Sequence, residues 1–169
     1  AKKEGKGLTY MFQGSDDRDA MKRIAEREGV RLSLMPSSGG PSVISAVMGG
    51  HADLGHTGAI LFDYVLSGKI RCLDASTPVR LAELPDVPTL REQGWDESVE
   101  MYVVLAAPKG LPADVLQRLN AAVDELKRDK AFSAFAVEKL RMRPVEFGMD
   151  HAAGYMEEAS RRYAAQAAR

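Results

Sequence analysis

The sequence predicts an α/β fold with a mainly parallel sheet covered by helices. Between residues 8 and 73, short apolar or alternating runs typical of strands take turns with segments whose apolar residues recur at helical spacing. Turns rich in glycine and serine separate these runs, so each element is short and has a clear end. Regular alternation of strand and helix is the pattern of parallel sheets built from strand–helix–strand units.

Composition sets the broad class of protein. A length of 169 residues suffices for one domain or two small lobes with a real core, and 45% hydrophobic with 28% charged residues is ordinary for a soluble globular protein. The net charge of -1, with no basic stripe among aromatics, argues against nucleic acid as a partner. The longest apolar run is far shorter than the roughly 20 residues of a membrane helix. Cys72 is the single cysteine, which excludes an intrachain disulfide, and no signal peptide is visible at Ala1.

The first half of the chain contains four predicted strands, the first three of them followed by helices. The strands are expected at residues 8–12, 30–35, 51–55 and 70–73. The first helix is capped by Ser15 or Asp16 and ends at Gly29. The second is stopped by Gly49, and the third covers residues 59–66.

The second half changes character. Prolines punctuate residues 75–94, where we expect turns and a small helix at 90–93. After it we expect an apolar strand at 101–107, an amphipathic helix from Pro112 and a second helix at 130–140. An extended segment at 144–147 and a last helix from a cap at Asp150 follow.

Two turns between residues 36 and 58 carry the main functional signal. They consist of Ser37, Ser38, Gly39 and Gly40 in the first and His56, Thr57 and Gly58 in the second. Such turns before helix N-termini present unpaired N–H groups, and the helix dipole favours negative charge there. The two serines are either ligand hydroxyls or turn formers that cap a helix at Ser42. Because no side chain here is set up for covalent chemistry, the stretch predicts a receptor cleft.

Metal and enzyme functions are disfavoured. The spacing of His51, Asp53 and His56 suggests a metal, but strand alternation places the first two on one face and His56 on the other. The sequence contains neither a Gly-x-Ser-x-Gly elbow nor a recognisable Cys/His pair for nucleophilic catalysis. We therefore expect no catalytic residue, no metal site and no cofactor.

A series of short motifs runs along nearly the whole chain. They are LTY at 8–10, GS at 14–15, GGPS at 39–42, GGHADLG at 49–55, SGKIRCL at 67–73, ELPDVPTLREQG at 83–94, LAAPKGLP at 105–112 and RLNAAVDE at 118–125. With this set, of which LPDVPT is the most distinctive member, the chain resembles the periplasmic solute receptors of tripartite tricarboxylate transporters, often called Bug receptors.

The resemblance implies a periplasmic-binding-protein type II-like fold, in which two hinged α/β lobes close on a small carboxylate such as a di- or tricarboxylate or an amino acid. It implies a periplasmic receptor that hands its ligand to a membrane permease and has no catalytic residues. Arg18 is either a ligand contact or a solvated helix charge. The other ligand-binding residues that the resemblance implies are Gly14, Ser15, Ser37, Ser38, Gly39, Gly40, His56, Thr57 and Gly58.

The chain departs from the family pattern in two respects. Residues 1–100 look like a complete second lobe, whereas 101–169 look like only the C-terminal part of the first, so that the chain is a fragment, repacks, or pairs with another chain. In the helix-start loop, Asp16 and Asp17 stand where the family has small residues and hydroxyls. Facing the cleft, each would oppose an anion by roughly 1–4 kcal/mol against about 0.3–1 kcal/mol of attraction from the dipole, unless Arg18 folds back over them. Two alternatives therefore stay open: a degenerate, self-associating form with weak or no ligand binding, and a regulatory domain that binds a small effector.

Overall fold

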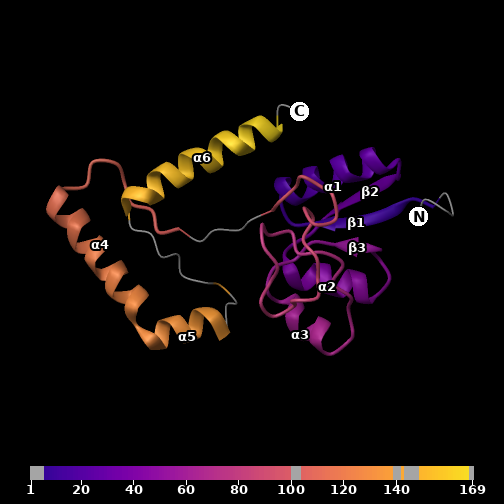
Figure 1. Ribbon diagram of the computed structural model, residues 1–169, viewed down its shortest axis with the longest axis horizontal. Helices are drawn as coiled ribbons and strands as arrows, with labels where there is room; N and C mark the ends of the chain where they lie inside the picture. Colours follow the sequence, from indigo (N-terminus) through magenta and orange to yellow (C-terminus); the bar gives the residue numbers. More distant parts are fainter. Residues whose placement is uncertain (1–5, 100–103, 139–141, 143–148, 168–169) are drawn as a thin grey trace. The chain divides into compact units, whose positions relative to one another are not determined.

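The computed structural model describes residues 6–99, 104–138, 142 and 149–167. The chain forms two compact units, Ala1–Tyr102 and Val103–Arg169. The sheet belongs to the first unit, and the second unit is helical in the residues described (Figure 1).

A three-stranded parallel sheet forms the centre of the first unit. Its strands are β1 (Leu8–Phe12), β2 (Leu32–Pro36) and β3 (Leu54–Gly55), in the spatial order β2-β1-β3. β1 pairs with β2 along its whole length and with β3 through Tyr10 and Met11. The predicted α/β class and the first three predicted strands are confirmed, although the third strand is only two residues long.

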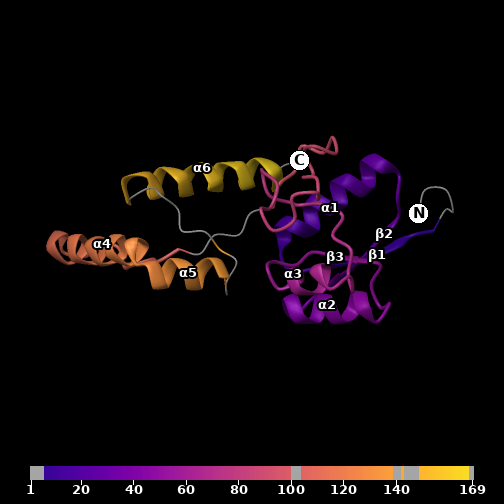
Figure 2. The same cartoon turned by 60° about the horizontal axis from the view of Figure 1, so that its bottom comes forward.

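Helices cover both faces of this sheet. α1 (Ser15–Glu28) lies on one face, and α2 (Gly40–Met48) and α3 (Leu61–Leu66) lie on the other (Figures 1 and 2). The chain moves from β1 outward to β2 and then back past β1 to β3, and right-handed connections in opposite directions place α1 and α2 on opposite faces. α2 packs closely on β3, because a Cβ atom on Gly55 would collide with the buried side chain of Val43.

The stretch 67–99 packs against α1 and forms no further helix or regular strand in the part of it that the structure describes. One isolated parallel bridge joins Ala75 to Thr89. Arg23 of α1 donates to both carboxylate oxygens of Glu97, at 2.6 and 2.7 Å. This bidentate ion pair holds the end of the stretch against α1.

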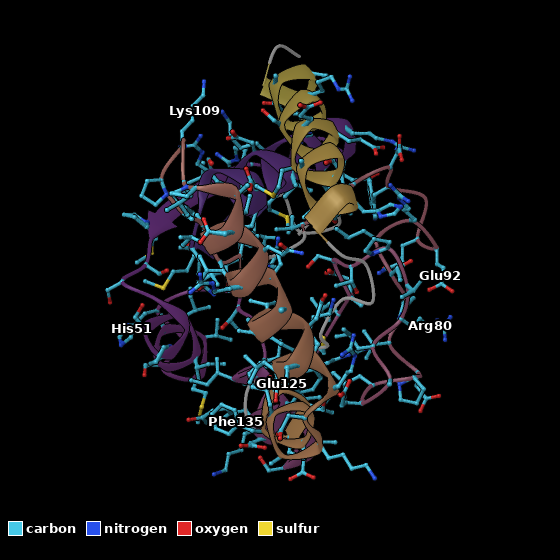
Figure 3. The ribbon with its side chains drawn as sticks, turned by 90° about the vertical axis from the view of Figure 1, so that its left-hand side faces the viewer. His51, Arg80, Glu92, Lys109, Glu125 and Phe135 are labelled. Carbon is cyan, nitrogen blue, oxygen red and sulfur yellow. The ribbon has the colours of Figure 1, made fainter. Side chains whose placement is uncertain are left out.

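Two predicted elements of this stretch are wrong. Residues 70–73 are not a strand, because the amides of Lys69 and Ile70 donate to the Tyr64 carbonyl at 2.9 and 3.2 Å and so extend the end of α3. Residues 90–93 form a turn rather than a helix. Arg80 reaches across to Glu92 in this turn and donates to its carboxylate at 2.9 Å (Figure 3).

In its described residues the second unit contains three helices, α4 (Ala113–Arg128), α5 (Lys130–Glu138) and α6 (Met149–Ala167). All three predicted helices are confirmed, although α6 begins one residue before the expected cap at Asp150. Of the predicted strand at 101–107, residues 104–107 are not in a strand, and 101–103 lie outside the described residues. The predicted extended segment at 144–147 also lies outside them.

Apolar side chains on α4 are exposed. Val115, Leu119 and Leu126 are 36%, 40% and 45% exposed, and α4 has no buried residue. Within the unit α4 packs against α5, and Phe135 of α5 is also exposed (Figure 3). Among its described residues, the second unit therefore exposes an apolar face on α4, as the sequence predicts.

Candidate functional site

Three loops meet at the carboxyl edge of the sheet. The amide of Ser37, just after β2, donates to the Phe12 carbonyl at the end of β1 (2.9 Å). The side-chain amide of Gln13, just after β1, donates to the carbonyl of His56, just after β3 (3.0 Å). Because the strands are parallel, their carboxyl ends lie at one edge, and these bonds tie the three loop tips together. The structure thus brings the predicted residues after β1, β2 and β3 to one place.

The strand order marks a binding position at this edge. β2 lies on one side of β1 and β3 on the other, so the chain crosses the sheet in opposite directions after β1 and after β2. The helices that follow the neighbouring strands β1 and β3, α1 and α3, therefore lie on opposite faces of the sheet. Open α/β sheets bind ligands outside the carboxyl ends of the strands at such a switch point. The loops in question are Gln13–Gly14 and residues 56–60.

The N-terminus of α1 is occupied by the chain itself. The carboxylate of Asp17 accepts hydrogen bonds from the Tyr10 hydroxyl (3.1 Å) and from the backbone amides of Gln13 (3.0 Å) and Gly14 (2.7 Å). Asp17 is only 4% exposed. Gly14 is the N-cap residue rather than Ser15 or Asp16, and Asp17 at the third helical position returns to its amide, as in a capping box.

Asp16 and Asp17 therefore do not act together at the cleft. Asp16 is exposed and accepts only a long bond from the Ser15 hydroxyl, at 3.3 Å, among the contacts described. Arg18 does not fold back over either of them. Its guanidinium donates to Asp19 at 2.7 and 3.0 Å and lies 5.9 Å from the ring centroid of Phe12, and the ion pair lowers the pKa of Asp19.

The N-terminus of α2 is built from the predicted serine–glycine turn. Gly39 is the N-cap residue, with a φ of 130° that favours glycine. Its amide donates to the Ser37 hydroxyl (3.4 Å), and the amide of Ser38 donates to the Ser42 hydroxyl (3.1 Å). Ser42 therefore closes the turn from within the helix instead of capping it. The Ser38 hydroxyl is exposed, and the structure gives the Gly40 amide no partner in the described residues.

A buried hydroxyl faces this helix end. Thr57 Oγ1 is shielded from solvent and has no hydrogen-bond partner among the described residues. A Cβ atom on Gly40 would lie 2.8 Å from this oxygen and 2.9 Å from Cγ2 of Ile60, so the first residue of α2 must be glycine for the loop to pack here. Buried hydroxyls are almost always hydrogen-bonded, which makes Thr57 Oγ1 an open position for an added donor or acceptor.

Titratable groups surround the β1 and β3 loops. Burial lowers the pKa of His56, and the nearby Asp17 and Asp74 only partly oppose this shift. Burial also raises the pKa of Asp74, partly offset by His56. Burial, with the adjacent Asp17 charge and hydrogen bond, strongly raises the pKa of Tyr10. At neutral pH the site therefore carries a neutral imidazole and phenol.

Sequence reasoning missed three residues of this arrangement. Tyr10 reads as part of an apolar strand, and neither Gln13 nor Asp74 lies in a motif of its own. Only the spacing Gly14-x-x-Asp17, which fits an N-cap and its third helical residue, could have revealed the role of Asp17.

The other metal candidates lie apart from the site. Asp53 accepts a hydrogen bond from the Thr9 amide (2.8 Å), which serves the sheet, and His51 is exposed after α2 (Figure 3). Over the stretches that the structure describes, no group of three His, Cys, Asp or Glu side chains could hold a metal ion.

The family is decided by a match over nearly the whole chain. The model of the tripartite tricarboxylate transporter family receptor (TctC) matches residues 1–166. The chain belongs to the TctC receptor family. It is 31% identical over 143 residues to Protein BugT of Bordetella pertussis, which covers 82% of this chain and 43% of BugT. It is 33% identical over 117 residues to the "UPF0065 protein in gbd 5'region" of Cupriavidus necator, covering 68% of this chain and 36% of that protein.

A solved TctC structure has the same fold. The ligand-free crystal structure of a TctC solute-binding protein from Polaromonas aligns with a TM-score of 0.71 at 22% identity, covering 95% of this chain and 56% of that one. This TctC chain thus spans less than half the length of the two curated relatives named. None of its helices in the described residues is long and apolar enough to cross a membrane.

Proposed function

We propose that this TctC chain is part of an extracytoplasmic receptor that captures a small carboxylate, a di- or tricarboxylate or an amino acid. The receptor passes the ligand unchanged to the membrane permease of a tripartite tricarboxylate-type transporter. Residues 1–100 serve as the second lobe and 101–169 as the C-terminal part of the first, and closure about a hinge holds the ligand. The chain acts without a cofactor or catalytic residue.

One observation carries this proposal: the loop tips after β1, β2 and β3 are hydrogen-bonded to one another beside the open N-terminus of α2. A helix N-terminus with unpaired amides attracts a carboxylate, by about 0.3–1 kcal/mol in exposed positions and more when partly buried. The Ser38 hydroxyl, the Gly40 amide and the Thr57 hydroxyl offer the polar partners there. Gly14, Ser15, Arg18, Ser37, Gly39, His56 and Gly58 complete the proposed set around them.

A thermal-shift experiment tests the function. The single tryptophan, Trp95, lies in the first unit, so its fluorescence reports the melting of the unit that carries the site. A ligand at 100 times its Kd stabilises by about 2.7 kcal/mol, which corresponds to a rise in Tm on the order of 5–10 °C for a chain of this size. Such a rise with any member of a panel of di- and tricarboxylates and amino acids is expected. A flat response to the whole panel contradicts the proposal.

Thr57→Val and Ser38→Ala locate the binding position. Thr57→Val removes a buried hydroxyl that has no described partner, so the unliganded protein should keep its stability or gain up to about 1 kcal/mol. The same change should weaken the bound carboxylate, as should Ser38→Ala. If both variants bind with unchanged affinity, the α2 end is not where the carboxylate lies.

Self-association is a second candidate, and the exposed apolar face of α4 favours it. The proposal is a homo-oligomer in which this face is covered by a second copy. Light scattering should then give a mass above that of one chain, reduced by Leu119→Glu. A clean monomer with a cooperative melt excludes it.

A further inference from the structure

We propose that two copies of this chain pair through α4 as antiparallel helices related by a two-fold axis, with Arg118 of each copy against Glu125 of the other. This inference rests on the self-association proposed above and adds to it the direction of pairing and the residues that decide that direction. The carboxylate-receptor function of the first unit does not depend on it.

The first step is an apolar seam on α4. Its members follow one another at intervals of four, three and four residues and are Val115, Leu119, Ala122 and Leu126. At 3.6 residues per turn these side chains fall within about 60° of the helix circumference. Intervals of three and four residues are those of the core positions of a two-helix coiled coil. All four residues are exposed in the described part of the chain, so this seam is uncovered there.

The second step concerns the two flanks of the seam. Arg118 and Glu125 lie on one flank, and the stick view labels Glu125 on α4 (Figure 3). Leu116 and Val123 lie on the other flank, and both are half-buried. One flank is therefore charged, with one residue of each sign, and the other flank is apolar.

Arg118 is available for a partner in another copy. Its side chain is 81% exposed, and its guanidinium donates to Asp114 of the same helix at 3.1 Å. Ion pairs of this kind between exposed residues four apart on a helix contribute little, because both groups stay solvated. Exchange of Asp114 for a carboxylate on a second helix therefore loses little.

The third step is that only antiparallel pairing matches both flanks. Antiparallel helices place the same flank of each helix together, and a two-fold axis makes every contact occur twice. The charged flank then brings Arg118 to Glu125 of the second copy, and the apolar flank brings Leu116 to Val123 of the second copy. Parallel helices would place the charged flank against the apolar one, with Arg118 beside Val123 of the second copy. Flanking residues of this kind set partner choice and orientation in coiled coils.

Sedimentation equilibrium of the full chain at increasing concentration measures the Kd of the dimer. A seam of four side chains per copy is smaller than a standard protein–protein interface, so the dimer should be weak and populated at high concentration. Arg118→Glu and Glu125→Arg each put like charges together twice in a symmetric dimer, and each should raise Kd about tenfold or more. The double variant exchanges the two charges and should return Kd to within about threefold of the wild type.

The two single variants also test the direction of pairing. Mixed in equal amounts, they should form a mixed dimer, because the charged flank of one variant is then wholly acidic and that of the other wholly basic. Native mass spectrometry separates this mixed dimer from the two symmetric ones by mass. Arg128→Glu is the matched control, since it makes the same charge change as Arg118→Glu at an exposed residue on the far side of α4, and it should leave Kd unchanged.

The outcomes separate this geometry from the functions proposed above. A wild type that stays monomeric up to about 1 mM overturns both the self-association and its geometry, and leaves carboxylate binding untouched. A dimer whose Kd is the same in the wild type and both single variants overturns the antiparallel pairing alone. Equal weakening by Arg128→Glu, or no mixed dimer from the two variants, overturns it as well. All the changed residues are exposed, so the far-ultraviolet circular dichroism of each variant should match that of the wild type.

Discussion

Replacement of Asp17 by asparagine tests the structural role of the buried carboxylate. The substitution keeps the size of the side chain and one acceptor oxygen, but it converts the other oxygen into a donor. Three donors now converge on this carboxylate: the Tyr10 hydroxyl and the amides of Gln13 and Gly14. The tyrosine hydroxyl can rotate to accept from the new amide group, whereas a backbone N–H cannot.

The magnitude follows from this count. One backbone amide loses its acceptor in a partly buried position, which costs about 1–3 kcal/mol. The other keeps a bond that changes from charge-assisted to neutral, a loss of about 1 kcal/mol. Asp17→Asn should therefore lower the free energy of unfolding by about 2–4 kcal/mol, a large part of the roughly 5–15 kcal/mol of an ordinary domain. The neighbouring Asp16→Asn removes the same charge from an exposed side chain and should change it by no more than about 0.5 kcal/mol.

Urea unfolding followed by the fluorescence of Trp95 measures both variants in the same unit. The two midpoints should separate clearly, with equal m-values. If Asp17→Asn and Asp16→Asn unfold together, the Asp17 carboxylate does not hold the β1–α1 loop as described.

Two further predictions concern packing and pH. Gly55→Ala should destabilise the first unit by about 1–3 kcal/mol, because its methyl group would collide with Val43. The control Gly154→Ala, with open space around it, should leave the unfolding transition detected by Trp95 unchanged. Equal urea midpoints for wild type and Gly55→Ala would show that α2 does not approach β3 this closely. Because burial lowers the pKa of His56 from its ordinary 6.5, the unfolded chain takes up a proton there that the folded chain does not, so stability present above about pH 6.5 is lost as the pH falls below it. Urea midpoints at pH 7.5 and 5.5 measure this loss, which His56→Gln should reduce and the exposed-site control His51→Gln should not. An identical change in midpoint between the two pH values for wild type and both variants would contradict the buried environment of His56.

Much of the first unit could be predicted from local pattern alone. The run Leu8–Phe12, the periodic helix ending at Gly29 and the alternating second strand each carry their own signal in the sequence, and parallel pairing follows from their alternation. The serine–glycine turn lies beside the loop after β3, because carboxyl ends of parallel strands share an edge.

The remaining features depend on contacts that the sequence does not encode locally. Residues 70–73 have an apolar alternation like that of a strand, but a strand needs a partner, and the amides of Lys69 and Ile70 donate to the Tyr64 carbonyl instead. The sequence predicts that Asp17 faces the cleft beside Asp16, since nothing in it shows that the Tyr10 hydroxyl lies within reach of the carboxylate. Thr57 was predicted as a site residue, but its lack of a partner is visible only in the folded chain.

Backbone amide chemical-shift mapping tests the central claim most directly. The 15N-labelled chain, titrated with the carboxylate or amino acid that raises the Tm most in the thermal-shift panel, should show its largest shifts at the loop tips after β1, β2 and β3, with the Gly40 and Thr57 amides among them. Shifts confined to α4–α6, or spread evenly over the surface of the chain, would contradict binding at the carboxyl edge of the sheet.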